Sequence, residues 1–355
     1  MRLTFRLEPF WVEVITVGIR SFVGLLFCLC YSVAVNAQQY AVVDRIPFSG
    51  DQTYWDYLTS DASSHRLYVT RGNEVLILDL DSGKQVASIA NMKRVHGVAL
   101  AHELNKGFIS DGGDNAIVVF DLKSNAVTNK IKVGNAPDAV LYEPTKKRVY
   151  AFNAHSHSAS VIDAETEKIV ATVPLSGIPE FAATDGRGNV FVNIENKSML
   201  VRFDADGTKV QNEWSLAPCK GPSGLAMDAH GRRLFSVCDN KFMIVTDAET
   251  GKQIAQIPVG VEPDAAIYDI EKKLVFSSNC DGTLTVVRQE SPDKYAVVQT
   301  LKTEREARTM ALDPVSHRLF LPSEQIKPGS RPPDPGDLPE FTPGTFHMMI
   351  VAPQM

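Results

Sequence analysis

The chain has 355 residues, of which 44% are hydrophobic and 22% charged, and its formal net charge is −6. A mildly acidic chain is not expected to be a general binder of nucleic acids or other polyanions, although a local basic patch is compatible with it. Length alone suggests two domains, but the repeat described below predicts one.

The first 37 residues predict a signal peptide rather than part of the fold. Arg2, Arg6 and Arg20 precede an apolar run over 22–35, and small residues end at Ala37, where we expect cleavage. An uncleaved membrane anchor is the alternative, but the run is shorter than the roughly 20 residues that span a bilayer. We therefore expect a periplasmic or secreted protein without a transmembrane domain after cleavage. Removing three arginines and two glutamates takes the net charge from −6 to −7.

The remaining residues, 38–355, consist of a repeated unit of four short alternating runs separated by turn residues, which is typical of a four-stranded antiparallel meander. An aromatic residue in the second run recurs every 40 to 44 residues, at Tyr68, Phe108, Tyr150, Phe191, Phe235, Phe276 and Phe320. An aspartate ending the third run recurs at Asp79, Asp121, Asp163, Asp204 and Asp247, and is replaced by Arg288 and Ala352 in the last two units. Seven such units predict an all-β fold, a single seven-bladed β-propeller. A linear β-solenoid is the alternative, but its coils are shorter.

The first strand after the signal peptide has no partners beside it in sequence. Residues 40–46 read as a fourth strand without its first three, whereas the seventh unit ends after three. We expect the N-terminal strand to complete the last blade and close the ring, which removes unpaired edges around the circle.

One face of the ring is expected to carry the turns between second and third strands and the links between blades. The opposite face carries Asp-, Ser- and Gly-rich hairpin turns, which we interpret as structural. On the first face the seventh turn is an insertion, Glu324–Phe346, with six prolines and three glycines. Segments of this length tend to be functional or disordered. It is predicted to be either a lid or partner-docking arm, or an insertion without a role.

Neither the common catalytic motifs nor the cysteines indicate a function. The chain has no G-x-S-x-G, P-loop, H-E-x-x-H or haem-attachment motif. Three cysteines follow the signal peptide, and an odd number allows at most one disulfide. Cys219 and Cys238 could meet on one face, and Cys280 would then be left over. The sequence leaves this pairing open.

A polar residue recurs at the start of each predicted inner strand, 11 or 12 residues before the aromatic one. The seven positions are Asp56, His96, Asp138, Glu180, Ser223, Asp264 and Arg308. Because inner strands line the axis of a propeller, these side chains are predicted to form a ring at one mouth of the central channel. Acids clustered in a partly enclosed funnel repel one another, which is expected to raise some of their pKa values or to recruit a cation. The alternative is that they only bind backbone amides at strand starts.

We expect Asp138, Glu180 and His96 to be the direct ligands of a cation or cationic group. His155 and His157, in one turn, are further candidate ligands for a divalent metal ion because two imidazoles in a strand-like loop point the same way. The alternative is that this turn is only polar and exposed.

The motifs V-G-N-A-P-D-A-V, R-V-Y-A-F-N and A-S-V-I-D-A-E-T resemble those of YVTN-repeat β-propeller proteins, and the exported single-domain layout is similar to the YncE-like group. Y-V-T itself occurs once, at Tyr68 to Thr70, and later units use phenylalanine. The resemblance implies the propeller fold. It also implies either a binding or scaffold protein that takes a small molecule or protein on its loop-rich face and channel mouth, or an enzyme of lactonase or lyase type. We favour binding, because the ring holds acids and one histidine but no recognisable catalytic set.

Overall fold

The computed structural model describes residues 39–52, 54–204, 206, 208–330 and 338–354. The predicted signal peptide and its cleavage position lie outside these residues. The described residues belong to a compact unit, Gln38–Met355. Within the described ranges, no helix is long and apolar enough to cross a membrane.

The strands form seven four-stranded antiparallel sheets, which confirms the predicted propeller. Each of the first six sheets is a simple meander in chain order. We number the seven sheets as blades 1 to 7 in chain order. Blade 1 contains β2 (Trp55–Asp61), β3 (Arg66–Arg71), β4 (Glu74–Asp79) and β5 (Gln85–Ile89). Blade 2 contains β6 (Val95–Ala101), β7 (Lys106–Asp111), β8 (Ala116–Asp121) and β9 (Val127–Lys132). Blade 3 contains β10 (Pro137–Glu143), β11 (Arg148–Asn153), β12 (Ser158–Asp163) and β13 (Lys168–Pro174).

The remaining blades follow the same order. Blade 4 contains β14 (Pro179–Thr184), β15 (Val190–Ile194), β16 (Met199–Phe203) and β17 (Val210–Ser215). Blade 5 contains β18 (Pro222–Asp228), β19 (Arg233–Cys238), β20 (Phe242–Asp247) and β21 (Gln253–Pro258). Blade 6 contains β22 (Pro263–Asp269), β23 (Leu274–Asn279), β24 (Thr283–Ser291) and β25 (Lys294–Lys302). Blade 7 contains β26 (Ala311–Leu312), β27 (Leu319–Ser323), β28 (His347–Pro353) and β1 (Tyr40–Pro47). Three short 3-10 helices lie in turns, η1 (His102–Leu104), η2 (Gly112–Asp114) and η3 (Glu195–Lys197).

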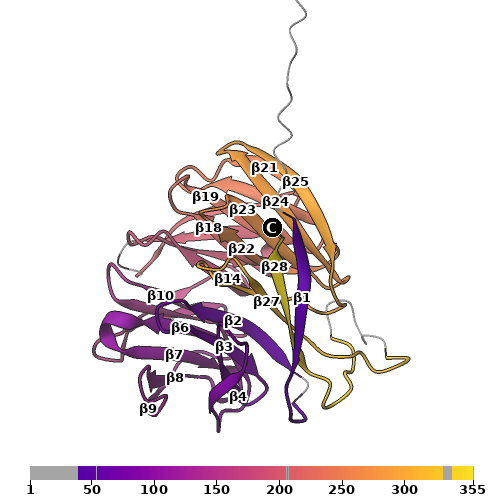
Figure 1. Cartoon of the computed structure of the whole chain (residues 1–355). Coiled ribbons are helices and arrows are strands. Elements are labelled where there is room, and N and C mark those ends of the chain that lie inside the picture. The colour runs from indigo at the N-terminus through magenta and orange to yellow at the C-terminus, as the bar shows by residue number, and fades with distance from the viewer. Residues whose placement is uncertain (1–38, 53, 205, 207, 331–337, 355) are drawn as a thin grey trace, which may run out of the picture. The chain divides into compact units, whose positions relative to one another are not determined.

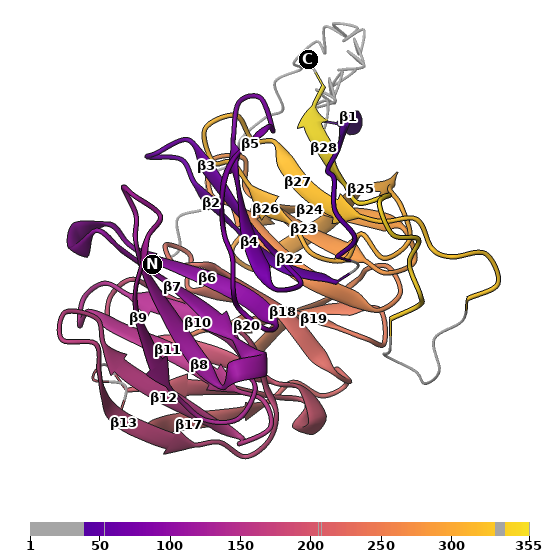
Figure 2. The same cartoon turned by 90° about the horizontal axis from the view of Figure 1, so that it is seen from below.

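The ring closes through β1, as predicted. β1 pairs antiparallel with β28, so the sheet order of blade 7 is β1-β28-β27-β26. Figure 1 shows the indigo β1 beside the yellow β28, and in Figure 2 the first and last blades lie next to each other. Tyr40 also ties this strand to blade 6, because its backbone exchanges two hydrogen bonds with the Gln299 side chain and its ring meets Phe276 edge-on at 5.0 Å. β1 therefore completes blade 7 and also connects it to blade 6.

The recurring residues have separate structural tasks. The seven second-strand aromatics are all buried in clusters that join neighbouring blades, which explains why the repeat retains them. The recurring aspartates accept backbone hydrogen bonds in the turns between third and fourth strands, on the opposite face from the ring. Examples are Asp79 from Ser82 at 2.9 Å, Asp163 from Thr166 at 2.8 Å and Asp247 from Thr250 at 2.9 Å. These are Asx turns, and their role is structural, as expected.

The insertion in blade 7 packs against blade 1 through aromatic side chains. The Trp55 ring lies 4.7 Å from Phe341 and 5.7 Å from Phe346, and all three side chains are buried. Ile326 bridges to Phe341, so the described parts of the insertion pair with each other. Cys219 and Cys238 form a disulfide, and Cys280 is free. This settles the pairing that the sequence left open.

Candidate functional site

Six of the seven predicted ring residues occupy the same place in the fold. Each is the second residue of an inner strand: Asp56 in β2, His96 in β6, Asp138 in β10, Glu180 in β14, Ser223 in β18 and Asp264 in β22. The register of every one of these strands shifts just after its first residue, which is the mark of a β-bulge. A β-bulge changes the direction in which the nearby side chains point. The bulge and the polar residue therefore recur together at the start of these inner strands. Arg308 differs, because it lies three residues before the short strand β26.

A cavity of about 600 Å³ opens at this mouth of the channel, on the face that carries the loops. Five ring residues line it, and turns and inter-blade links supply most of the others. Its walls are Tyr54, Asp56, Tyr57, Arg94, Glu180, Glu195, Ser223, Asp239, Glu262, Pro263, Asp264, Cys280, Arg305, Glu306, Arg308 and Leu338. Leu338 belongs to the blade 7 insertion, which therefore reaches the cavity. Of the described residues in the ring, His96 and Asp138 lie outside this lining.

The cavity is acidic, with seven carboxylate side chains against three arginines. Burial, together with the charges of Asp138 and Asp264, raises the pKa of Glu180 well above its usual value. Burial also raises the pKa of Asp264 in spite of the nearby Arg308 charge, and it raises the pKa of Glu195. A positive charge placed among these carboxyl groups would therefore stabilise the ionised form of several of them.

Arg308 compensates one side of the cavity. Its Nε lies 2.9 Å from Asp264 Oδ2, and its Nη2 donates to the Trp55 carbonyl at 2.8 Å. Ser223 donates a further hydrogen bond of 2.7 Å to Asp264 Oδ1. Arg308 and Ser223 thus compensate Asp264 directly, whereas Glu180 has no basic side chain paired with it among the described residues.

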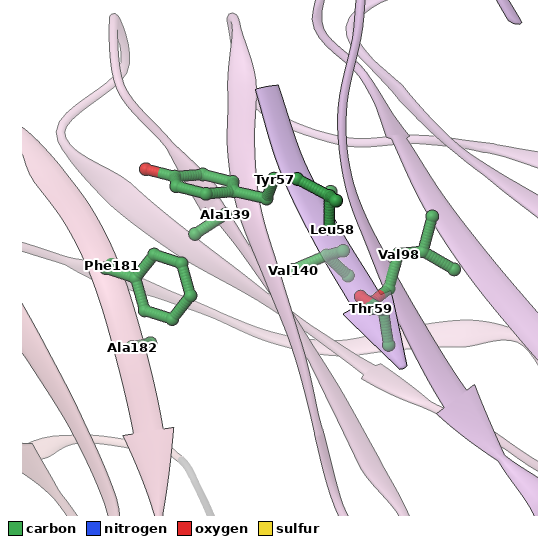
Figure 3. Close-up of a pocket in the computed structure, with 9 residues that line it drawn as sticks. Tyr57, Leu58, Thr59, Val98, Ala139, Val140, Phe181 and Ala182 are labelled. Carbon is green, nitrogen blue, oxygen red and sulfur yellow. The ribbon is translucent and has the colours of Figure 1, made fainter. Parts of the chain in front are cut away.

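Glu180 is held from across the channel. Tyr57, on β2, donates a hydrogen bond of 2.7 Å to Glu180 Oε1, on β14. The Tyr57 ring also meets Phe181 edge-on at 4.6 Å. Figure 3 shows the Tyr57 and Phe181 side chains near each other. They line a small cavity of about 50 Å³ together with Leu58, Val98 and other inner-strand residues. Tyr57 lines both cavities, whereas Phe181 lines the small one and not the large one.

His96 sits in a second polar group, next to the large cavity. Its Nδ1 lies 2.7 Å from Asp56 Oδ2, 3.1 Å from Asp138 Oδ1 and 3.1 Å from the Tyr54 hydroxyl. Burial lowers the pKa of His96, but the two carboxylates outweigh burial and raise it to about 10. Burial raises the pKa of Asp56, but His96 and Arg308 lower it overall. Clustering therefore does not raise the pKa of every acid in the ring.

The structure groups the candidate metal ligands differently from the sequence prediction. Within the described part of the chain, the His, Cys, Asp and Glu side chains close enough to share one ion are Asp56, His96 and Asp138. Glu180 is bound to Tyr57 and is not a member of this group. His155 and His157 are exposed and also lie outside it. His157 has φ +46°, so its backbone is in the left-handed region of a turn and not in the extended loop that was expected.

Sequence reasoning missed several residues of the cavity. Glu195 and Asp239 lie in the loop-face turns N-I-E-N-K and C-D-N-K, so their position on this face could be read from the repeat. Tyr57 directly follows a ring position, but no pattern indicates that its hydroxyl crosses the channel. Glu262 and Glu306 lie in links of irregular length, where the repeat gives no register.

No protein-family model matches the chain. Over 148 residues it is 28% identical to YncE of Salmonella typhi, an uncharacterized protein, and the match spans 40% of this chain and 42% of that protein. YncE of Salmonella typhimurium LT2 is 27% identical over 148 residues, with the same coverage of 40% and 42%. The chain thus matches about two-fifths of the length of these curated relatives.

Solved structures with low sequence identity share the whole architecture. The structure of U3-55K has a TM-score of 0.74 at 9% identity, covering 88% of this chain and 99% of that one. The crystal structure of RRP9 WD40 repeats has a TM-score of 0.75 at 9% identity, covering 89% and 100%. At this identity the likeness shows the fold alone. The chain is therefore a β-propeller that resembles the YncE-like proteins over two-fifths of its length.

Proposed function

We propose that this protein is an exported binding protein whose acidic cavity takes a small organic cation bearing ammonium or guanidinium groups. Export rests on the predicted signal peptide. The observation that carries the proposal is the excess of seven carboxylates over three arginines in one cavity of about 600 Å³. That volume is within the usual range of small-molecule sites.

Attraction between the carboxyl groups of the cavity and a bound cation would supply the binding energy. In the free protein, burial and the charges of Asp138 and Asp264 raise the pKa of Glu180 well above its usual value, so its ionised form is disfavoured. A cation beside Glu180 and Glu195 favours their ionised forms and relieves the repulsion between them. Binding is therefore coupled to proton release, and affinity increases with pH while the ligand remains charged.

Aromatic side chains add a second means of recognition. Tyr54 and Tyr57 line the cavity, and the Arg94 guanidinium lies over the Tyr54 ring at 4.6 Å. This contact shows that the face of Tyr54 accepts a cation, and such contacts are worth about 0.5–1 kcal/mol at exposed sites. A ligand guanidinium or ammonium that displaces Arg94 would make the same contact.

The test is isothermal titration calorimetry of the purified protein with 1,4-diaminobutane and with agmatine, which between them carry both cationic groups. The neutral diol 1,4-butanediol is the matched ligand control. We expect one site per chain for at least one cation, weaker binding at higher salt, and no heat with the diol. Glu180→Gln should weaken binding by about tenfold, equivalent to about 1.4 kcal/mol.

Glu165→Gln is the matched control variant, because Glu165 is an exposed carboxylate in a turn on the opposite face that pairs with Lys147 at 2.6 Å. It should bind as the wild type does. Equal affinity for the diol and the cations, or no binding of either cation, would overturn the proposal.

Catalysis of lactonase or lyase type is the second candidate, and one observation favours it. Glu180 and Glu306 both line the cavity, and burial raises the pKa of each. Carboxyl groups with raised pKa values act as general acids and bases near neutral pH. Hydrolysis of a lactone panel that is lost in Glu180→Gln and kept in Glu165→Gln would favour the enzyme.

A further inference from the structure

The group formed by Asp56, His96, Asp138 and Tyr54 has fewer protons than polar contacts. Four short contacts join its atoms: His96 Nδ1 to Asp56, to Asp138 and to Tyr54, and the Tyr54 hydroxyl to Asp56 at 2.7 Å. An imidazole Nδ1 carries at most one hydrogen and a phenol carries one. With both aspartates ionised, these two hydrogens serve four contacts, so the contacts outnumber the hydrogens.

A second observation points the same way. Asp138 Oδ1 is buried and accepts no hydrogen bond from any described residue, although it lies 3.1 Å from His96 Nδ1. A buried carboxylate oxygen without a donor is costly unless a cation compensates it. One ion among Asp56 Oδ2, His96 Nδ1 and Asp138 Oδ1, taking the place of the Nδ1 proton, would satisfy all three atoms, which lie within 4.8 Å of one another.

The backbone holds these ligands in place. They come from three adjacent inner strands, β2, β6 and β10, each at the same bulge. Gly112 packs against the imidazole so closely that a Cβ there would lie 2.7 Å from His96 Nε2. The ring is therefore held on its Nε2 side by backbone, and Nδ1 faces the two carboxylates.

We propose that Asp56, His96 and Asp138 bind one divalent first-row transition-metal ion at the channel mouth, with the Tyr54 hydroxyl beside it. One imidazole nitrogen and two carboxylate oxygens form a mixed N/O set of the kind that suits Zn²⁺ or Mn²⁺. Asp56 and Tyr54 also line the large cavity, so the ion would sit in its wall. This site does not depend on the organic cation proposed above, whose binding relies on Glu180.

The first experiment titrates Zn²⁺ and Mn²⁺ into metal-stripped, untagged protein in competition with a chromophoric chelator. We expect one ion per chain, bound with micromolar affinity or tighter. Asp56→Asn, His96→Gln and Asp138→Asn should each weaken binding by about tenfold or more, since each removes one of three ligands.

Matched variants separate this site from its rivals. Asp114→Asn removes a carboxylate on the same face that is bound to Lys93 and Lys130, and it should leave metal affinity unchanged. The double variant His155→Gln/His157→Gln should also leave it unchanged. Glu180→Gln should keep metal binding and lose the organic cation, so the two proposals fail separately.

A crystal of the wild-type protein soaked in Zn²⁺ gives a readout that needs no variant to fold. We expect an anomalous peak between the three side chains. Three results would overturn the proposal: a peak elsewhere only, no binding of either ion tighter than millimolar, or loss of binding in the His155/His157 double variant with retention in His96→Gln.

Discussion

Glu324, at the start of the blade 7 insertion, carries a pH dependence that can be worked out from the structure. Its side chain is buried, with 2% exposure, and neither carboxylate oxygen has a hydrogen-bond partner among the described residues. Burial raises its pKa from 4.5 to about 7, against the opposing charge of Arg71. The folded chain therefore keeps a proton that the unfolded chain releases between about pH 4.5 and 7.

This proton determines whether the folded state gains or loses stability as the pH rises. A carboxyl group with a raised pKa in the folded state destabilises the fold as pH rises through this window, and the penalty is complete above pH 7. At about 1.36 kcal/mol per pKa unit, the full penalty is about 3 kcal/mol. Glu324→Gln removes it while keeping the shape of the side chain. The advantage of the variant over wild type should grow by about 2 kcal/mol between pH 5 and pH 8.

Urea unfolding at pH 5, 6, 7 and 8 measures this difference. Glu340→Gln is the control, because Glu340 lies in the same insertion but is exposed and pairs with Lys327. Its stability should follow the wild-type curve at every pH. A variant Glu324→Gln that is less stable than wild type at pH 8 would refute the reasoning, since it would mean that Glu324 is ionised and well paired.

Three other predictions concern the framework and the N-terminus. Deleting residues 40–47 should expose the edge of β28 and make the protein aggregate or unfold less cooperatively, and an unchanged melting curve would refute the closing role of β1. Replacing Cys219 and Cys238 by serine opens a loop with a sequence separation of 19 residues and should cost about 3 kcal/mol in the free energy of unfolding; an unchanged urea midpoint would contradict this. Mass spectrometry of the protein purified from its native host should give an N-terminus at Gln38, and an N-terminus at Met1 would argue for an uncleaved anchor.

The fold could be predicted because its repeat is carried by residues that do local work. Tyr150 fills a space between blades and Asp163 caps a hairpin turn; every blade has the aromatic residue and the first five have the aspartate at the same spacing. That spacing also fixed the height of the ring residues along the axis, because the bulge after the first residue of each inner strand repeats with them.

Contacts across the axis could not be predicted in the same way. Periodicity places Asp138 and Glu180 at equivalent positions, but it does not indicate which neighbours each one meets. Asp138 lies beside His96, whereas Glu180 receives a hydrogen bond from Tyr57, three blades away in sequence. The packing of the insertion could not be predicted either. The contact between Phe341 and Trp55 depends on where the chain folds back, and it follows no repeat.

A cation bound in the acidic cavity would lower the raised pKa of Glu180 and so favour release of its proton. Calorimetry of 1,4-diaminobutane binding at pH 7, in buffers with different ionisation enthalpies, measures the number of protons released. We expect net proton release on binding, and less of it in Glu180→Gln. Binding without proton release, or with the same release in Glu180→Gln, would contradict this expectation.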